Sequence, residues 1–104
     1  MDAEFKKKWI EALRSGEYRQ GTHCLRSIEN KYCCLGVACD LFYGTNKWIE
    51  NKEEYLYEIN NQKIFSYNLN QYIELSDKEM DDLMQLNDGG KTFEEIADYI
   101  EKEF

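Results

Sequence analysis

The feature that most constrains the fold is the stretch of residues 20–44, which holds all four cysteines, the only histidine and the densest apolar run of the chain. Residues 33–43 are almost wholly apolar, and this length is typical of a buried helix in which Gly36 marks close packing against a neighbour. Residues 17–32 alternate between two faces and predict a β-hairpin. A hairpin that leads into a core helix predicts mixed α and β structure.

Length and composition limit the chain to one folded unit in water. With 104 residues, a second core would leave each half too small to fold unaided, so we expect a single domain over residues 1–104. A hydrophobic content of 42% excludes a disordered chain, and 33% charged residues exclude an integral membrane protein. No apolar run approaches the roughly 20 residues of a spanning helix, and residues 1–13 lack the apolar core of a signal peptide. We therefore expect a cytoplasmic protein with reduced cysteines.

Residues typical of helix starts and helix ends occur near both ends of the chain. Residues 2–15 place apolar side chains on one helical face. Asp2 can cap the start of this helix, and Gly16 follows as a left-handed cap. Capping boxes at Ser76–Glu79 and Thr92–Glu95 each open a further helix. Residues 87–90 separate these two helices, because their sequence NDGG is typical of a turn.

The middle of the chain predicts a second hairpin. Residues 48–67 are rich in tyrosine and alternate around a turn at residues 60–62, and residues 68–75 have room for a single helical turn. The whole pattern predicts an α+β fold, in which a small antiparallel sheet of two β-hairpins packs with three to four helices.

The charge argues against a nucleic-acid partner. The formal net charge is −8, with 13 basic against 21 acidic side chains, whereas nucleic-acid affinity comes mainly from basic side chains that neutralise phosphates. Residues 83–104 imitate the start of a helix-turn-helix domain, but their acidic last helix favours a structural helical hairpin. A small anionic ligand is compatible with this charge, because one or two arginines in a pocket can hold a phosphate.

His23 and the cysteines have the composition of a zinc site, or of a cysteine nucleophile with its base. Their spacing lacks a C-x2-C knuckle, and neighbours on a strand such as His23 and Cys24 point to opposite faces. Cys33 or Cys34 could come across the hairpin to meet His23, but nothing in the sequence supplies a third group to orient the histidine. We therefore expect no metal, no cofactor and no catalytic residues.

Seven side chains could together hold a small nucleotide-like anion. Arginine grips phosphate with paired hydrogen bonds, polar side chains bind ribose hydroxyls or base edges, and an aromatic ring stacks on a base. The predicted ligand-binding residues are Arg14, Tyr18, Gln20, Arg26, Trp48, Asn87 and Asp88. For Asn87 and Asp88, a turn between two helices is the competing interpretation.

The chain resembles a family of small proteins found widely in phages and prophages. The shared pattern begins with WIEALRSGEYRQ at residues 9–20 and CLR at residues 24–26. It continues with YCCLGVACD at residues 32–40, LND at residues 86–88 and FEEIADYIE at residues 93–101. The resemblance covers both ends of the chain, about two-thirds of it.

This resemblance implies a small acidic phage protein that acts against a host defence. The expected function is to bind and sequester a nucleotide-derived immune signal, of the cyclic nucleotide or cyclic ADP-ribose type, without catalysis, in the host cytoplasm. A pocket between protomers would let so short a chain enclose a ligand, so we expect a homo-oligomer. Two alternatives stay open. One is an acidic inhibitor that binds a host defence or nucleic-acid-handling protein. The other is a hydrolase of signalling nucleotides.

Overall fold

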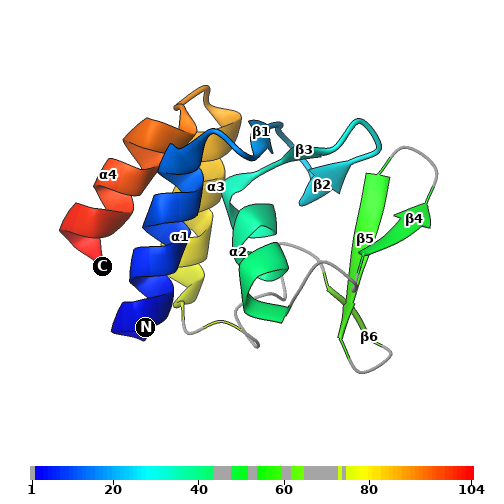
Figure 1. Ribbon diagram of the computed structural model, residues 1–104, viewed down its shortest axis with the longest axis horizontal. Coiled ribbons are helices and arrows are strands. Elements are labelled where there is room, and N and C mark those ends of the chain that lie inside the picture. Colours follow the sequence, from blue (N-terminus) through cyan, green and yellow to red (C-terminus); the bar gives the residue numbers. More distant parts are fainter. Residues whose placement is uncertain (1, 44–47, 52–53, 60–61, 65–72, 74) are drawn as a thin grey trace.

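The computed structural model describes residues 2–43, 48–51, 54–59, 62–64, 73 and 75–104 (Figure 1). The helices in this part of the chain are α1 (Ala3–Ser15), α2 (Cys34–Tyr43), α3 (Asp77–Asp88) and α4 (Phe93–Glu103). The strands are β1 (Arg19–Gln20), β2 (Arg26–Ser27), β3 (Lys31–Tyr32), β4 (Trp48–Asn51), β5 (Glu54–Ile59) and β6 (Gln62–Ile64). None of the described helices is long and apolar enough to span a membrane.

The fold has a helical side and a sheet side, with α2 between them (Figure 1). α1 packs against α4 and α2, and α3 packs against α2 and α4. On its other side α2 contacts the sheet, where the buried Tyr57 hydroxyl of β5 donates to the Cys39 carbonyl of α2 over 2.7 Å. This arrangement confirms the predicted α+β class.

The strands form one mixed sheet in the order β1-β3-β2-β5-β4, and β6 also pairs with β5. β2 and β3 form the first predicted hairpin, and Asn30 in its turn has a left-handed backbone with φ 63°. β5 and β6 form the second predicted hairpin. β1 differs from the prediction because it runs parallel to β3, so the sheet is not purely antiparallel. A strand of two residues carries no sequence period that could specify its direction.

The helix ends follow the predicted caps. The Asp2 carboxylate accepts the Phe5 backbone N–H over 2.9 Å, and Gly16 ends α1 in the left-handed conformation with φ 79°. Both predicted capping boxes are present at the starts of α3 and α4. These helices could be predicted because each cap satisfies backbone groups of its own first turn and depends on no distant contact.

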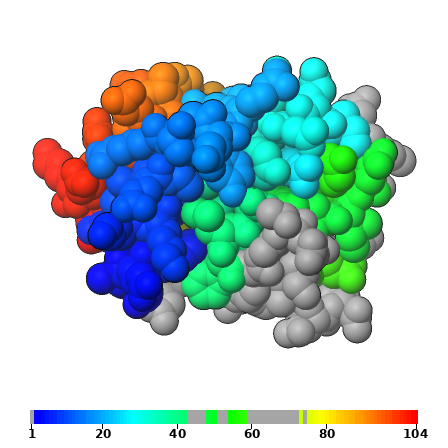
Figure 2. All heavy atoms as spheres, viewed as in Figure 1, coloured from blue at the N-terminus to red at the C-terminus, as the bar shows by residue number. Residues whose placement is uncertain are grey.

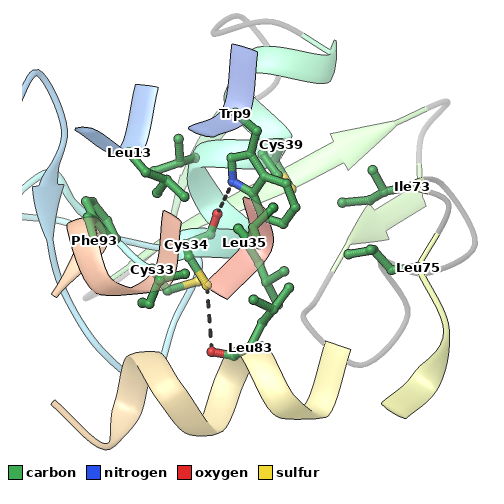
Figure 3. Close-up of a cluster of buried hydrophobic side chains, with 14 of the residues drawn as sticks. Trp9, Leu13, Cys33, Cys34, Leu35, Cys39, Ile73, Leu75, Leu83 and Phe93 are labelled. Atoms are coloured by element: carbon green, nitrogen blue, oxygen red, sulfur yellow. Dashed lines mark hydrogen bonds between the residues drawn. The ribbon is translucent and has the colours of Figure 1, made fainter. Parts of the chain in front are cut away.

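The core forms around Trp9 and α2. Trp9 is fully buried, and its indole Nε1 donates to the Cys34 carbonyl over 3.0 Å. The Cys34 thiol in turn lies 3.7 Å from the Leu83 carbonyl of α3 (Figure 3). A Cβ on Gly36 would lie 1.9 Å from the Leu25 carbonyl oxygen, which confirms that this glycine allows close packing.

Residues 22–25 overturn the prediction of a continuous first strand. They form a bend between β1 and β2, and His23 has a left-handed backbone with φ 68°. The alternation expected along this segment is therefore wrong, and His23 and Cys24 are not held on opposite faces of a sheet. The helical turn expected within residues 68–75 falls largely outside the described residues.

Candidate functional site

The seven predicted ligand-binding side chains fall into three groups in the structure. Arg14 lies between α1 and α4, away from the others. Gln20, Asn87 and Asp88 meet where the segment after β1 packs on the turn between α3 and α4. Tyr18, Arg26 and Trp48 meet at the sheet, beside α2. The prediction of one site is therefore corrected to two neighbouring clusters and one separate arginine.

Arg14 joins the first and last helices. Its Nη2 lies 2.6 Å from the Asp98 carboxylate and its Nη1 lies 3.2 Å from the Glu101 carboxylate. Hydrogen bonds to Glu101 and then to Asp98 raise the pKa of the guanidinium above its ordinary value. Two carboxylates thus already compensate this positive charge, which leaves little reason for an anionic ligand to bind there.

Gln20 and Asn87 form an amide junction between the segment after β1 and the α3–α4 turn. Asn87 is 1% exposed, and its Oδ1 accepts from the Cys34 backbone N–H over 3.2 Å and from Gln20 Nε2 over 3.1 Å. Its Nδ2 donates to the Gly21 carbonyl over 2.8 Å. Gln20 Oε1 accepts the Phe93 backbone N–H over 3.0 Å. Both amides bind protein groups on their oxygen and nitrogen atoms, so the junction is structural.

Asp88 orients His23, a contact that the sequence did not predict. The Asp88 carboxylate accepts the His23 backbone N–H over 3.1 Å, and its other oxygen lies 3.3 Å from the imidazole Nδ1. The two residues are far apart in sequence, and the only signal was the polar pair Asn87-Asp88 at a helix end. They border a cavity of about 50 Å³ with the following lining: His23, Cys24, Cys33, Cys34, Leu35, Met84, Asn87 and Asp88.

The four cysteines differ in their exposure to solvent. All four are free thiols, and only Cys24 is not buried. Burial raises the pKa of the Cys33 thiol to about 12. Burial also raises the pKa of the Cys24 thiol, and the negative charges of Glu54 and Asp88 raise it further. The described residues contain no group of three or more His, Cys, Asp or Glu side chains arranged to hold a metal ion.

Arg26 lies at the centre of an arginine–aromatic cluster, which consists of Tyr18, Arg26, Tyr32, Trp48 and Tyr55. Its guanidinium carbon lies 4.0 Å from the ring centre of Tyr55, 5.2 Å from that of Tyr32 and 5.5 Å from that of Trp48. Strand pairing explains the geometry, because Arg26 is the partner of Tyr32 on β3 and of Tyr55 on β5. In the space-filling view, the atoms of β2 and β3 meet those of β4 and β5 on one side of the molecule (Figure 2).

The guanidinium of Arg26 has no carboxylate partner among the described residues. Its Nε and Nη2 lie 3.2 and 2.6 Å from the Asn30 side-chain oxygen, which is neutral. Within the part of the chain that the structure describes, no carboxylate forms an ion pair with Arg26 and no partner binds its Nη1. A half-buried arginine that faces rings is thus available to an anion.

A buried carboxylate holds two of the aromatic rings in place. Asp40 on α2 is 7% exposed, and its oxygens accept from the Tyr18 hydroxyl over 2.5 Å and from the Trp48 indole over 2.9 Å. Burial, followed by the bond to Asp40, raises the pKa of Tyr18. The Tyr32 ring stands edge-on to both Tyr18 and Trp48, at 5.0 and 5.9 Å between ring centres. Hydrogen bonds to Asp40 and edge-on packing on Tyr32 thus define the positions of the Tyr18 and Trp48 rings.

The two clusters are neighbours on the sheet. Gln20 of β1 pairs with Tyr32 of β3, which pairs with Arg26 of β2. The backbones of Gln20 and Arg26 therefore lie two strand spacings apart, roughly 10 Å. Six of the seven predicted side chains belong to these two clusters, and Arg14 lies apart from them.

Comparison with known proteins indicates a family and no function. The family model for a domain of unknown function, DUF8296, matches residues 1–67. That match includes the whole arginine–aromatic cluster, whereas Asn87 and Asp88 lie beyond it. No curated protein and no solved structure matches the chain. Because the matched part is more than half of its 104 residues, the chain belongs to the DUF8296 family.

Proposed function

We propose that this is a phage counter-defence protein that binds and sequesters a small nucleotide-derived immune signal in the host cytoplasm, without turning it over. The observation that supports the proposal is the environment of Arg26. Acidic side chains outnumber basic ones by 21 to 13 in this chain, yet no described carboxylate pairs with Arg26. A guanidinium left without an acid in so acidic a protein is suited to an external anion.

The chemistry of the cluster favours a phosphate attached to a ring. Arg26 Nη1 can donate to phosphate oxygens, while the partly exposed Tyr55 and Trp48 rings beside it supply aromatic surface for a base. A long polyanion fits poorly, because the net charge of −8 repels it beyond the first contact. A small cyclic nucleotide or a cyclic ADP-ribose isomer combines few phosphates with a flat ring system, which suits this arrangement.

A second copy of the chain would complete the site. Arg26 and its rings are partly exposed, and Arg26 is the arginine that one protomer supplies to this cluster. β4 is the last strand in the order of the sheet, and its Ile49 is 44% exposed. Pairing of two protomers near β4 would bring two clusters together and enclose the ligand. The proposal therefore includes a homo-oligomer.

The experiment that tests this function is a depletion and release assay. The purified protein is incubated with cyclic dinucleotides, cyclic trinucleotides and cyclic ADP-ribose isomers, and is then heated to release what it has bound. The proposal predicts that one ligand disappears from solution and returns chemically intact. A ligand that returns altered indicates a hydrolase, and no depletion of any ligand refutes the small-molecule function.

The charge distribution favours one second candidate, an acidic inhibitor of a host defence or nucleic-acid-handling protein. Residues 76–104 carry ten acidic and three basic side chains, whereas residues 1–75 carry eleven and ten. Almost all of the net charge therefore lies on α3, α4 and the turn between them. Such a surface complements a basic groove on a partner protein. This candidate predicts binding to the partner that weakens steeply as salt rises from 50 to about 500 mM.

A further inference from the structure

The turn of the first hairpin carries an asparagine, Asn30, whose side chain binds the guanidinium of Arg26. Arg26 Nε and Nη2 donate to the Asn30 side-chain oxygen over 3.2 and 2.6 Å. Asn30 itself is exposed, whereas the arginine that it binds is half-buried beside the rings. The contact therefore positions Arg26 and adds nothing to the core.

The backbone of Asn30 limits which residues suit this turn. Asn30 has a left-handed backbone with φ 63°, and its N–H donates to the Ser27 carbonyl over 2.9 Å. The next N–H, that of Lys31, donates to the Ser27 hydroxyl over 3.2 Å. Glycine, asparagine and aspartate adopt the left-handed conformation at the lowest cost. The turn thus accepts three kinds of side chain, which are a hydrogen atom, an amide and a carboxylate.

Of these three, only the amide binds the guanidinium without neutralising it. Glycine offers no acceptor, so the Arg26 side chain would lose this contact. Aspartate would place a carboxylate where the amide oxygen now lies, 2.6 Å from Nη2, and the two charges would pair. The chain has 21 acidic side chains, yet it carries a neutral one at this position beside Arg26.

The contact leaves one edge of the guanidinium open. A guanidinium has five N–H groups, one on Nε and two on each Nη. The Asn30 oxygen accepts one from Nε and one from Nη2. Among the residues that the structure describes, none accepts a hydrogen bond from the others. The Nη1–Nη2 edge therefore keeps the parallel pair of N–H groups that matches two oxygens of a phosphate.

Tyr55 restricts the guanidinium from a second direction. The guanidinium carbon lies over the Tyr55 ring at 4.0 Å from its centre, and the two residues are partners on neighbouring strands. Contact with Asn30 on one edge and with a ring on one face leaves the arginine few other positions. A ligand then has less of the side chain to order when it binds.

We propose that Asn30 is a positioning residue of the anion site. It holds Arg26 by a neutral acceptor, so that the open Nη1–Nη2 edge binds one phosphate group of the ligand through paired hydrogen bonds and keeps its positive charge. The inference rests on the proposed function, because Asn30 acts on the ligand only through Arg26.

The test uses isotope-labelled full chain and follows the Arg26 Nε–H signal by NMR. Cyclic AMP is the probe, since it joins a phosphate to a base, and adenosine is the matched probe without phosphate. Asn30→Asp should weaken cyclic AMP binding by about 10-fold or more, because the carboxylate neutralises the guanidinium and repels the phosphate. Asn30→Gly should weaken it by about 2- to 10-fold, because the ligand must then immobilise the arginine itself. Neither variant should change the affinity for adenosine.

The aspartate variant separates positioning from a purely structural role. Aspartate matches asparagine in size and in tolerance of the left-handed backbone, so a structural role predicts wild-type affinity for cyclic AMP in Asn30→Asp. Its Tm should not fall, because an exposed ion pair replaces an exposed hydrogen bond. Gln85→Glu is the control, since it adds the same charge at an exposed position on α3 and should leave the affinity within about 2-fold of wild type.

Two failures can be told apart. Wild-type affinity in Asn30→Asp, together with weaker binding in Arg26→Ala, would overturn the role of Asn30 and leave the Arg26 site in place. If cyclic AMP does not affect the Arg26 signal in the wild-type chain, this inference is overturned together with the phosphate contact of the proposed function.

Discussion

Replacement of Asn87 by alanine tests whether the amide junction is structural, as the contacts indicate, or part of a ligand site. Asn87 lies at the end of α3 and its Oδ1 accepts the N–H of Cys34, the first residue of α2. Helix first turns leave N–H groups without an intrahelical partner, so Asn87 caps α2 from a distant part of the chain. Asn87→Ala removes this cap and also the bonds to Gln20 and Gly21.

The magnitude follows from what each former partner does afterwards. The Cys34 N–H is buried and loses its acceptor, which costs about 1–3 kcal/mol. The Gln20 amide and the Gly21 carbonyl are half-buried and can find water, so each loses about 0.5–1 kcal/mol. We expect a total loss of about 2–5 kcal/mol in the free energy of unfolding. At about 4–8 °C per kcal/mol for a domain near this size, Tm should fall by about 8–40 °C.

The assay is urea and thermal unfolding followed by far-UV circular dichroism. Gln85→Ala is the matched control, since it truncates an exposed amide in the same helix whose bond is to the neighbouring Asp81 side chain. That control should change the free energy of unfolding by less than about 0.5 kcal/mol. A loss below about 1 kcal/mol for Asn87→Ala would refute the structural interpretation and return Asn87 to the list of ligand contacts.

Three further perturbations test other parts of the account. Gly36→Ala should unfold the protein or lower Tm strongly, because the new Cβ would lie 1.9 Å from the Leu25 carbonyl oxygen and neither atom can move without a shift of the backbone. An unchanged Tm would contradict this packing. Thr92→Ala should cost about 1 kcal/mol in urea unfolding, through loss of the α4 cap; an unchanged midpoint would show that the cap contributes nothing. The backbone bond to Thr92 lowers the pKa of Glu95 in the folded state, so its contribution is present above the unfolded pKa and is lost as pH falls through the lower folded pKa. The free energy of unfolding, measured in urea across this pH range, should depend less on pH in Glu95→Gln than in wild type. Equal pH dependence in the two proteins would show that the Glu95 carboxylate does not contribute to stability in this way.

The helices could be predicted because their signals are local. Asp2, Ser76 and Thr92 each bind a backbone N–H of the helix that they start, so residues close together in sequence decide the outcome. The sheet was harder to predict, because pairing joins residues that are distant in sequence. The parallel pairing of β1 with β3 depends on how Gly21 and the amide junction fix the chain after β1, and no periodicity of two residues encodes that.

The sequence predicted which types of residue form the candidate site, but it did not predict which of them lie together. Arg14 and Arg26 look equivalent in the sequence, but packing of α1 on α4 gives two acids to Arg14, whereas strand pairing surrounds Arg26 with rings. With 21 acidic residues in the chain, sequence alone cannot tell which arginine is compensated. The contact of His23 with Asp88 was missed for a related reason, because it depends on a bend where a strand was expected.

The measurement that most directly tests the central claim compares the two arginines by equilibrium dialysis with the ligand that the depletion assay identifies. Arg26→Ala should weaken binding by about 10–100-fold, since a hydrogen bond to a charged group contributes about 1.5–3 kcal/mol. Arg14→Ala should bind as wild type does, because its guanidinium already faces Asp98 and Glu101. Thermal melting confirms that both variants are folded. Equal affinity of wild type and Arg26→Ala, or a greater loss in Arg14→Ala, would contradict the claim that Arg26 anchors the ligand.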